Sequence, residues 1–123
     1  MPEERVIFVV DDDDAVRDSI CMLLESYGVA SRSYASGEVF LKNLSSEHGC
    51  LLTDVNMPGM NGLQLLDELR GRGILFPVIV MTGEPHRSVQ VAVDQAGAML
   101  LRKPFRPREL ITCLEEALGG SLA

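Results

Sequence analysis

Residues 6–14 read Val-Ile-Phe-Val-Val-Asp-Asp-Asp-Asp, an unbroken apolar run followed at once by four acids. Such a run is typical of a strand that is buried on both faces, as in a parallel sheet covered by helices. Three later apolar runs lead in the same way to reactive residues: Leu51–Thr53 to Asp54, Val78–Met81 to Thr82 and Gly83, and Met99–Leu101 to Lys103 and Pro104. Because open parallel sheets bind ligands at the carboxyl ends of their strands, we expect these side chains to meet in one shallow pocket.

Strand-like and helix-like patterns alternate along the whole chain and predict an α/β fold, a doubly wound parallel sheet of five strands. The strands are expected at Val6–Val10, Ala30–Tyr34, Cys50–Thr53, Val78–Met81 and Met99–Arg102. Helices are expected at Ala15–Tyr27, after Ser36, at Leu63–Arg72, at roughly Arg87–Ala96 and at Pro107–Leu118. We predict that Asp14 caps the first helix and that Ser36 caps the second.

Length and composition indicate one domain, over residues 1–118, with 119–123 as a tail or the start of a linker. The net charge of −7 argues against a domain that grips nucleic acid. Cys21, Cys50 and Cys113 are odd in number and lie in apolar stretches, so we expect buried, reduced thiols. No apolar run is long enough to span a bilayer, and Met1–Arg5 does not resemble a signal peptide. A soluble, cytoplasmic protein is expected.

Three carboxylates are expected in the pocket, from Asp11, Asp12 and Asp54. Two carboxylates about 4 Å apart repel each other by roughly 4 kcal/mol at an effective dielectric constant near 20. Oxygen ligands with open positions suit Mg²⁺, which would relieve this repulsion. An aspartate can attack phosphorus, so Asp54 is the predicted nucleophile, although a structural role at the following bend is an alternative. Asp13 and Asp14 could simply cap the next helix.

The remaining pocket residues suit a phosphoryl group. Lys103 offers a point charge to a phosphate oxygen, and Thr82 with the Gly83 N–H could donate to the others. A cis bond before Pro104 would aim Lys103 at the pocket. His86 and His48 are predicted to be surface loop residues, so the phosphoryl group is expected on Asp54 rather than on a histidine.

Together these residues resemble the receiver domain of a two-component response regulator, of the CheY-like superfamily. The resemblance runs from Val6 to about Leu118. Its motifs are Val-Val-Asp-Asp-Asp-Asp-Ala-Val-Arg, Leu-Thr-Asp-Val-Asn-Met-Pro-Gly-Met-Asn-Gly-Leu, Val-Ile-Val-Met-Thr-Gly and Arg-Lys-Pro-Phe. Residues 34–41 and 54–62 are most similar to the FixJ-type branch, whose full-length members are usually transcription factors. The family fold is a five-stranded parallel sheet in the order 2-1-3-4-5 with five helices.

The resemblance implies that Asp11 and Asp12 hold Mg²⁺ together with Asp54 and the backbone carbonyl of Asn56. Asp54 would accept a phosphoryl group from a histidine of a partner sensor kinase. The domain would then be a switch that phosphorylates and dephosphorylates itself, rather than a turnover enzyme.

The resemblance also assigns the switch hydroxyl to Thr82 and the phosphate-binding cation to Lys103. Asn56 and Glu84 occupy the two positions that tune hydrolysis of the acyl phosphate in the family. This pair is similar to that of the chemotaxis regulator, so we predict a short-lived phosphoryl group.

One region departs from the family pattern. Leu100 stands three residues before Lys103, where relatives usually carry Tyr or Phe, and the stretch from Ala98 to Lys103 is one residue shorter than in most relatives. An inward-swinging aromatic ring is the usual coupling element, so we predict a weakened or altered switch. The affected face, of the fourth helix, fifth strand and fifth helix, is where the family commonly dimerises on phosphorylation.

Other readings stay open. An aspartyl-phosphate phosphatase of the haloacid-dehalogenase kind would need a second acid where Asn56 stands and room for a cap domain. A nucleotide-binding module would need glycines where the four acids stand. A pseudo-receiver would lack a site residue, and none is missing. Transcription would be regulated through an effector domain absent from these residues, and the alternative is a stand-alone regulator acting by protein contacts.

Overall fold

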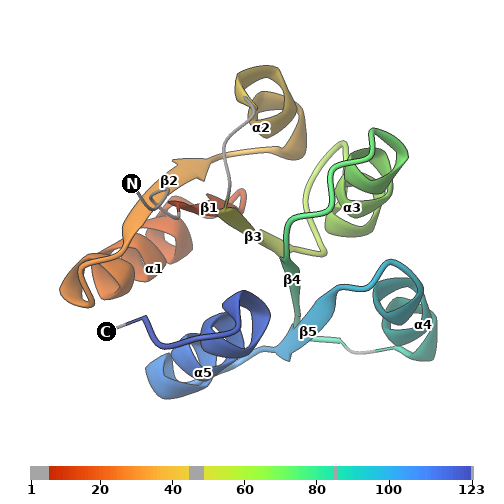
Figure 1. The fold of residues 1–123 in the computed structure, drawn as a ribbon. Coiled ribbons are helices and arrows are strands. Elements are labelled where there is room, and N and C mark those ends of the chain that lie inside the picture. Colours follow the sequence, from red (N-terminus) through yellow and green to blue (C-terminus); the bar gives the residue numbers. More distant parts are fainter. Residues whose placement is uncertain (1–5, 45–48, 85, 123) are drawn as a thin grey trace.

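The computed structural model describes residues 6–44, 49–84 and 86–122. Five parallel strands form one sheet in the order β2-β1-β3-β4-β5, which confirms the predicted fold class (Figure 1). The strands are β1 (Val6–Val10), β2 (Ala30–Tyr34), β3 (Gly49–Asp54), β4 (Val78–Thr82) and β5 (Met99–Arg102). The helices are α1 (Asp14–Ser26), α2 (Gly37–Asn43), α3 (Gly62–Gly71), α4 (Arg87–Gln95) and α5 (Pro107–Leu118).

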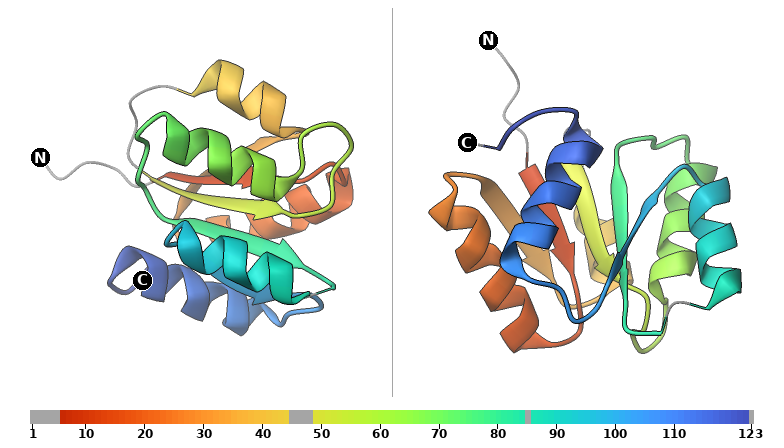
Figure 2. Two further views of the ribbon diagram at one scale, coloured as in Figure 1. Left: turned by 90° about the vertical axis from the view of Figure 1, so that its right-hand side faces the viewer. Right: turned by 90° about the horizontal axis from the view of Figure 1, so that it is seen from below.

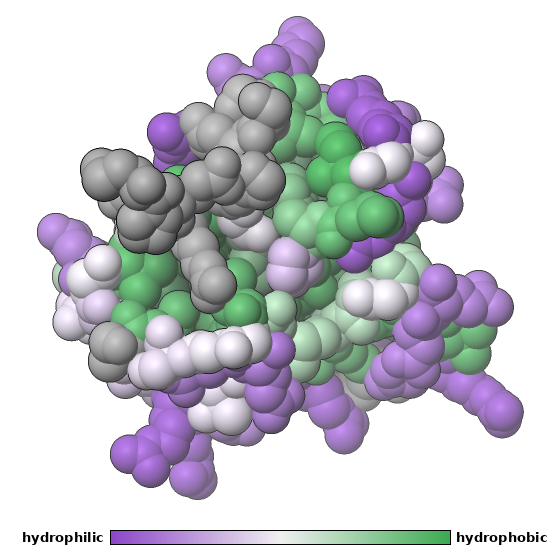
Figure 3. Space-filling view, viewed as in Figure 1, coloured by the Kyte–Doolittle hydropathy of each residue, from purple (hydrophilic) through white to green (hydrophobic). Residues whose placement is uncertain are grey.

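Helices cover both faces of the sheet, as Figure 2 shows. On one face α1 and α5 enclose a core cluster that includes Ile7 and Leu24, and on the other α2, α3 and α4 enclose a second cluster that includes Phe8 and Phe40. The inner strands β1, β3 and β4 are buried along their whole length, which explains their continuous apolar sequences. In the view of Figure 3, apolar side chains gather toward the middle of the face and hydrophilic ones at the rim.

The helix caps confirm one prediction and correct another. Ser36 caps α2, where its hydroxyl accepts a hydrogen bond from the Val39 N–H at 3.1 Å. The prediction that Asp14 caps α1 is wrong, because the Asp13 carboxylate accepts from Ala15 N at 2.9 Å. Asp14 is instead the first residue of the helix, so α1 begins and ends one residue earlier than the apolar spacing indicated.

Arg70 of α3 joins the carboxyl-terminal ends of two helices. Its guanidinium donates to the carbonyls of Ala96 at 2.9 Å, Ile74 at 2.9 Å and Phe76 at 3.1 Å. Burial lowers the pKa of this guanidinium. The Ala96 carbonyl lies at the end of α4, a helix without a basic residue in its last turn, so Arg70 supplies the positive charge that this end favours. The first turn of α4 lacks a side-chain cap.

The cysteines are free thiols, and burial separates them into two kinds. Cys50 and Cys113 are buried in the cluster between the sheet and α5, as predicted, whereas Cys21 is only half-buried on α1. After α5, the Leu122 N–H donates to the Glu115 carboxylate at 3.1 Å, so the tail turns back toward its helix. Across the described ranges, every helix is too short or too polar to cross a bilayer.

Candidate functional site

The strand register places the predicted site residues side by side. Val10 of β1 pairs with Thr53 of β3, so the next residues along the two strands, Asp11 and Asp54, are neighbours at the carboxyl edge of the sheet. On the other side of β3, Asp54 pairs with Met81, the residue before Thr82. Parallel strand pairing alone therefore brings these residues together, although they lie far apart in the sequence.

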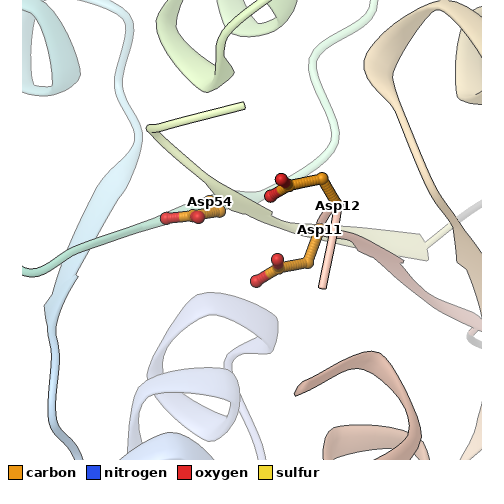
Figure 4. Close-up of side chains that lie close together, drawn as sticks. All are labelled: Asp11, Asp12 and Asp54. Atoms are coloured by element: carbon orange, nitrogen blue, oxygen red, sulfur yellow. The ribbon is translucent and has the colours of Figure 1, made fainter. Parts of the chain in front are cut away.

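Asp11, Asp12 and Asp54 form an aspartate cluster, with one carboxylate oxygen of each within 4.8 Å of the others. Figure 4 shows their side chains together where β1 and β3 end. Asp11 and Asp54 are buried, with 1% and 8% of their surface exposed, whereas Asp12 is exposed. Carboxylates this close, two of them buried, repel one another strongly unless a cation lies among them.

Lys103 supplies a positive charge to this cluster. Its Nζ atom lies 3.4 Å from Asp54 Oδ1 and 3.6 Å from Asp11 Oδ2. Its main-chain N–H donates to the Thr82 carbonyl at 2.8 Å, which fixes the start of the loop after β5. The bond from Lys103 to Pro104 is cis, as the sequence suggested.

The Asp11 carboxylate is incompletely satisfied. Its Oδ1 atom accepts the Asp13 N–H at 2.9 Å, whereas Oδ2 is buried without a hydrogen-bond partner. Burial, together with the neighbouring Asp54 and Asp12 charges, raises the pKa of the Asp11 carboxyl, although the Asp13 N–H and the Lys103 ammonium act to lower it. A buried oxygen that accepts no hydrogen bond and lies beside two further carboxylates is the environment that a divalent cation with oxygen ligands would complete.

The other predicted site residues lie around the cluster. Thr82 is buried at the end of β4, and its hydroxyl accepts the Glu84 N–H at 3.1 Å. Gly83 follows on the exposed loop beside Lys103, since a Cβ on Gly83 would lie 4.0 Å from the lysine Cβ. Asn56 is exposed in the loop after β3.

The Glu84 side chain contacts a surface histidine. The glutamate side chain is exposed and lies 3.6 Å from Nε2 of His86, the N-cap residue directly before α4. His86 is therefore a surface residue, as predicted, and His48 lies outside the described residues.

Gly62 holds the loop after Asp54 against the strand end. Its N–H donates to the Val55 carbonyl at 2.9 Å, and a Cβ here would stand 2.2 Å from the carbonyl oxygen of Asp54. Only glycine permits this approach, so α3 can begin directly beside the site. Asn61 caps α3 through a reciprocal pair of hydrogen bonds with Gln64, both at 2.9 Å.

Arg17 belongs to this site although sequence reasoning did not single it out. From the first turns of α1 its Nη1 atom donates to the Asp11 carbonyl at 2.6 Å, and its Nη2 atom pairs with Asp14. A hydrogen bond to a main-chain carbonyl cannot be recognised in the sequence, because every residue type has this acceptor. The available signal was a cation near a helix amino terminus, where positive charge is disfavoured.

The chain is similar to known proteins along nearly its whole length. The family model described as "Response regulator receiver domain" matches residues 7–115. The transcriptional regulatory protein FixJ of Azorhizobium caulinodans is 45% identical over 125 residues, which cover 98% of this chain and 58% of that protein. The chain thus spans little more than half the length of this curated relative.

Solved structures show the same fold. A structure titled FixJ-N superposes with a TM-score of 0.82 at 32% identity and covers 99% of both chains. A CheY-like response regulator receiver domain protein from Methanospirillum hungatei gives a TM-score of 0.87 at 29% identity, covering 95% of each chain.

Proposed function

The chain belongs to the response regulator receiver domain family, and from that premise we propose that it is a magnesium-dependent phosphoacceptor switch. A sensor histidine kinase would donate the phosphoryl group, and Asp54 would accept it. One observation carries the proposal: Asp11 Oδ2 is buried without a hydrogen-bond partner, beside the other carboxylates of the aspartate cluster and the Lys103 ammonium. A buried carboxylate in this state is stabilised when a cation binds it.

The donor set fits Mg²⁺. The aspartate cluster offers only oxygen ligands, and exposed Asp12 leaves room for the waters that this ion retains. Asp11, Asp12 and Asp54 would hold it, together with the main-chain carbonyl of Asn56 as the family implies. When bound, the ion supplies positive charge to the phosphate oxygens next to Asp54.

In the proposed transfer, a carboxylate oxygen of Asp54 attacks phosphorus while the bond from phosphorus to the kinase histidine breaks. The electron pair of that bond returns to the imidazole nitrogen, and an acyl phosphate forms on Asp54. Lys103 already contacts Asp54 and would bind one phosphate oxygen. The Thr82 hydroxyl accepts a hydrogen bond from the Glu84 N–H and still has its own proton to donate. Together with the Gly83 N–H, it would donate to the other phosphate oxygens.

Asn56 and Glu84 are proposed to set the lifetime of the acyl phosphate. Both side chains are exposed in the loops after β3 and β4, and the pair is similar to that of the chemotaxis regulator. We therefore expect a short-lived phosphoryl group. A phosphorylated form that persists for many hours without a phosphatase would contradict this assignment.

The proposed output is regulation of transcription, since the similar A. caulinodans protein is a transcriptional regulatory protein and this chain covers 58% of it. An effector domain outside these residues would bind DNA, and residues 1–118 would form the receiver. The net charge of −7 supports a domain that does not itself bind nucleic acid. Phosphorylation would promote homodimerisation, and a stand-alone regulator remains the second candidate.

Incubation with acetyl phosphate and Mg²⁺, followed by intact mass spectrometry, tests the proposal. We expect the mass of one added phosphoryl group, which Asp54→Asn abolishes and which chelation of Mg²⁺ prevents. Asp67→Asn, at an exposed acid on α3, is the matched control and should be modified like the wild type.

Two outcomes would reject the proposed function. One is modification that survives in Asp54→Asn, and the other is no modification of a folded wild-type protein. Steady turnover of a small phosphomonoester would instead favour the phosphatase reading.

A further inference from the structure

We propose that Arg17 is a positioning residue for the magnesium site, which orients Asp11 through the Asp11 main-chain carbonyl. This inference rests on the proposed function, because it assumes that the aspartate cluster binds Mg²⁺. Arg17 does not touch the cluster's carboxylate oxygens. It would act by fixing the peptide group that links Asp11 to Asp12, and hence the directions of both side chains.

The contacts of Asp11 show how completely the residue is held. Its N–H donates to the Tyr34 carbonyl at 3.2 Å, and its Oδ1 atom accepts the Asp13 N–H at 2.9 Å. Its carbonyl accepts from Arg17 Nη1 at 2.6 Å. The remaining polar atom is Oδ2, which lacks a hydrogen bond and lies 3.6 Å from Lys103 Nζ. Hydrogen bonds at three of the four polar atoms of Asp11 thus fix the residue, and the fourth atom, Oδ2, is left available to the cluster.

The position of Arg17 is unfavourable for α1 itself. The guanidinium reaches back over the amino-terminal end of the helix, where the aligned peptide dipoles create partial positive charge. The side chain is also largely buried, with 14% of its surface exposed, although a guanidinium is costly to bury. An acidic or neutral side chain at this position would stabilise the helix more than an arginine does.

The ion pair with Asp14 does not account for this burial. The Asp14 side chain is 85% exposed, and an ion pair with an exposed partner contributes about 1 kcal/mol at most. The buried interaction is the one with the Asp11 carbonyl. Groups that orient a metal ligand typically change metal affinity by about 10- to 100-fold when removed.

The test measures Mg²⁺ binding to metal-free protein by isothermal titration calorimetry, for the wild type, Arg17→Met and Asp14→Asn. We expect Arg17→Met to raise the dissociation constant for Mg²⁺ by about 10-fold. The sign is informative, because removal of a nearby positive charge would by itself strengthen cation binding. Asp14→Asn removes the ion pair and keeps the bond to Asp11, so its dissociation constant should stay close to the wild-type value.

Two further measurements separate positioning from general stability. Thermal melting without metal shows whether Arg17→Met is folded; if it is not, Arg17→Lys keeps the charge with a single compact donor and should still weaken Mg²⁺ binding. The rate of modification by acetyl phosphate should recover at saturating Mg²⁺, since the loss lies in metal affinity and not in the chemistry.

The inference is overturned if a folded Arg17 variant binds Mg²⁺ as tightly as the wild type or more tightly. It is equally overturned if Asp14→Asn weakens binding as much as Arg17→Met. A folded wild-type protein that binds no Mg²⁺ would instead refute the proposed function on which the inference rests.

Discussion

Replacement of Lys103 by methionine should reduce stability without metal and increase the stabilisation that Mg²⁺ provides. The Lys103 ammonium lies 3.4 Å from Asp54 Oδ1 and 3.6 Å from Asp11 Oδ2. Methionine keeps most of the aliphatic stem and removes the charge. The two buried carboxylates would then face each other without a neighbouring cation.

The size of the effect follows from these distances. At an effective dielectric constant near 20, each attraction to Lys103 is about 5 kcal/mol, and the repulsion between Asp11 and Asp54, whose carboxylate oxygens lie within 4.8 Å of each other, is at least about 3.5 kcal/mol. The lysine side chain is 29% exposed, and its removal also avoids the cost of desolvating the ammonium, so most of the attraction is offset. We expect a net loss of about 3 kcal/mol, the lower end for breaking a buried ion pair.

Urea unfolding followed by circular dichroism measures this loss near neutral pH, with a chelator and with Mg²⁺. Burial raises the pKa of Asp11, so folding favours its protonated form. The stability that Asp11 contributes in this form is present below its ordinary value and is lost as the pH rises through the raised value. The deficit of Lys103→Met should therefore grow from acidic to neutral pH, because its cause is the ionised carboxylates.

The matched control is Lys42→Met, at an exposed lysine of α2, which should change the free energy of unfolding by less than about 0.5 kcal/mol. Equal unfolding free energies for Lys103→Met and the wild type in chelator would refute the electrostatic reasoning. So would an equal gain from Mg²⁺ in both proteins.

Three further predictions concern other parts of the domain. Gly62→Ala should lower the free energy of unfolding in urea by about 2–3 kcal/mol, since its Cβ would stand 2.2 Å from the Asp54 carbonyl oxygen. Gly71→Ala in the same helix meets nothing within 4 Å and should raise the free energy of unfolding by about 0.5 kcal/mol. Similar values for both variants would contradict this reasoning. Burial raises the pKa of Cys50 to about 12 and of Cys113 to about 11, so their contribution to stability is complete below the ordinary value of 9.0 and is lost as the pH rises through 11–12. Native alkylation by iodoacetamide at mildly alkaline pH should accordingly be far slower for these two thiols than in urea, and equal rates would disprove their burial. Leu100→Phe should strengthen dimerisation after phosphorylation, measured by size-exclusion chromatography, because it restores a ring beside β4; an unchanged elution profile would count against an altered switch.

The sequence was sufficient for the fold because the inner strands are buried on both faces and therefore read as unbroken apolar runs. The bounds of β1, β2, β5 and α5 are those predicted, and the other elements with a predicted range differ by one residue at one or both ends, as at β3, which spans Gly49–Asp54. The error at α1 has a specific cause: with four acids in a row, residue type alone does not show that Asp13 rather than Asp14 reaches the free N–H groups.

The convergence of Asp11, Asp12, Asp54 and Lys103 was also predictable, since each lies at or just after the carboxyl end of a strand of one parallel sheet. What could not be predicted were contacts to the main chain. The bond from Arg17 to the Asp11 carbonyl depends on backbone geometry that no spacing of residue types encodes.

The hydrogen bonds of Arg70 hold the carboxyl-terminal end of α4 more firmly than its amino-terminal end. The end at Ala96 is pinned to α3 and to the chain that leads into β4, whereas the beginning of the helix, closer in sequence to Thr82, has no side-chain cap. A displacement that starts at Thr82 would therefore rotate α4 about its carboxyl-terminal end and would not shift the helix along its axis. The largest excursion would fall on the first turn, at Arg87.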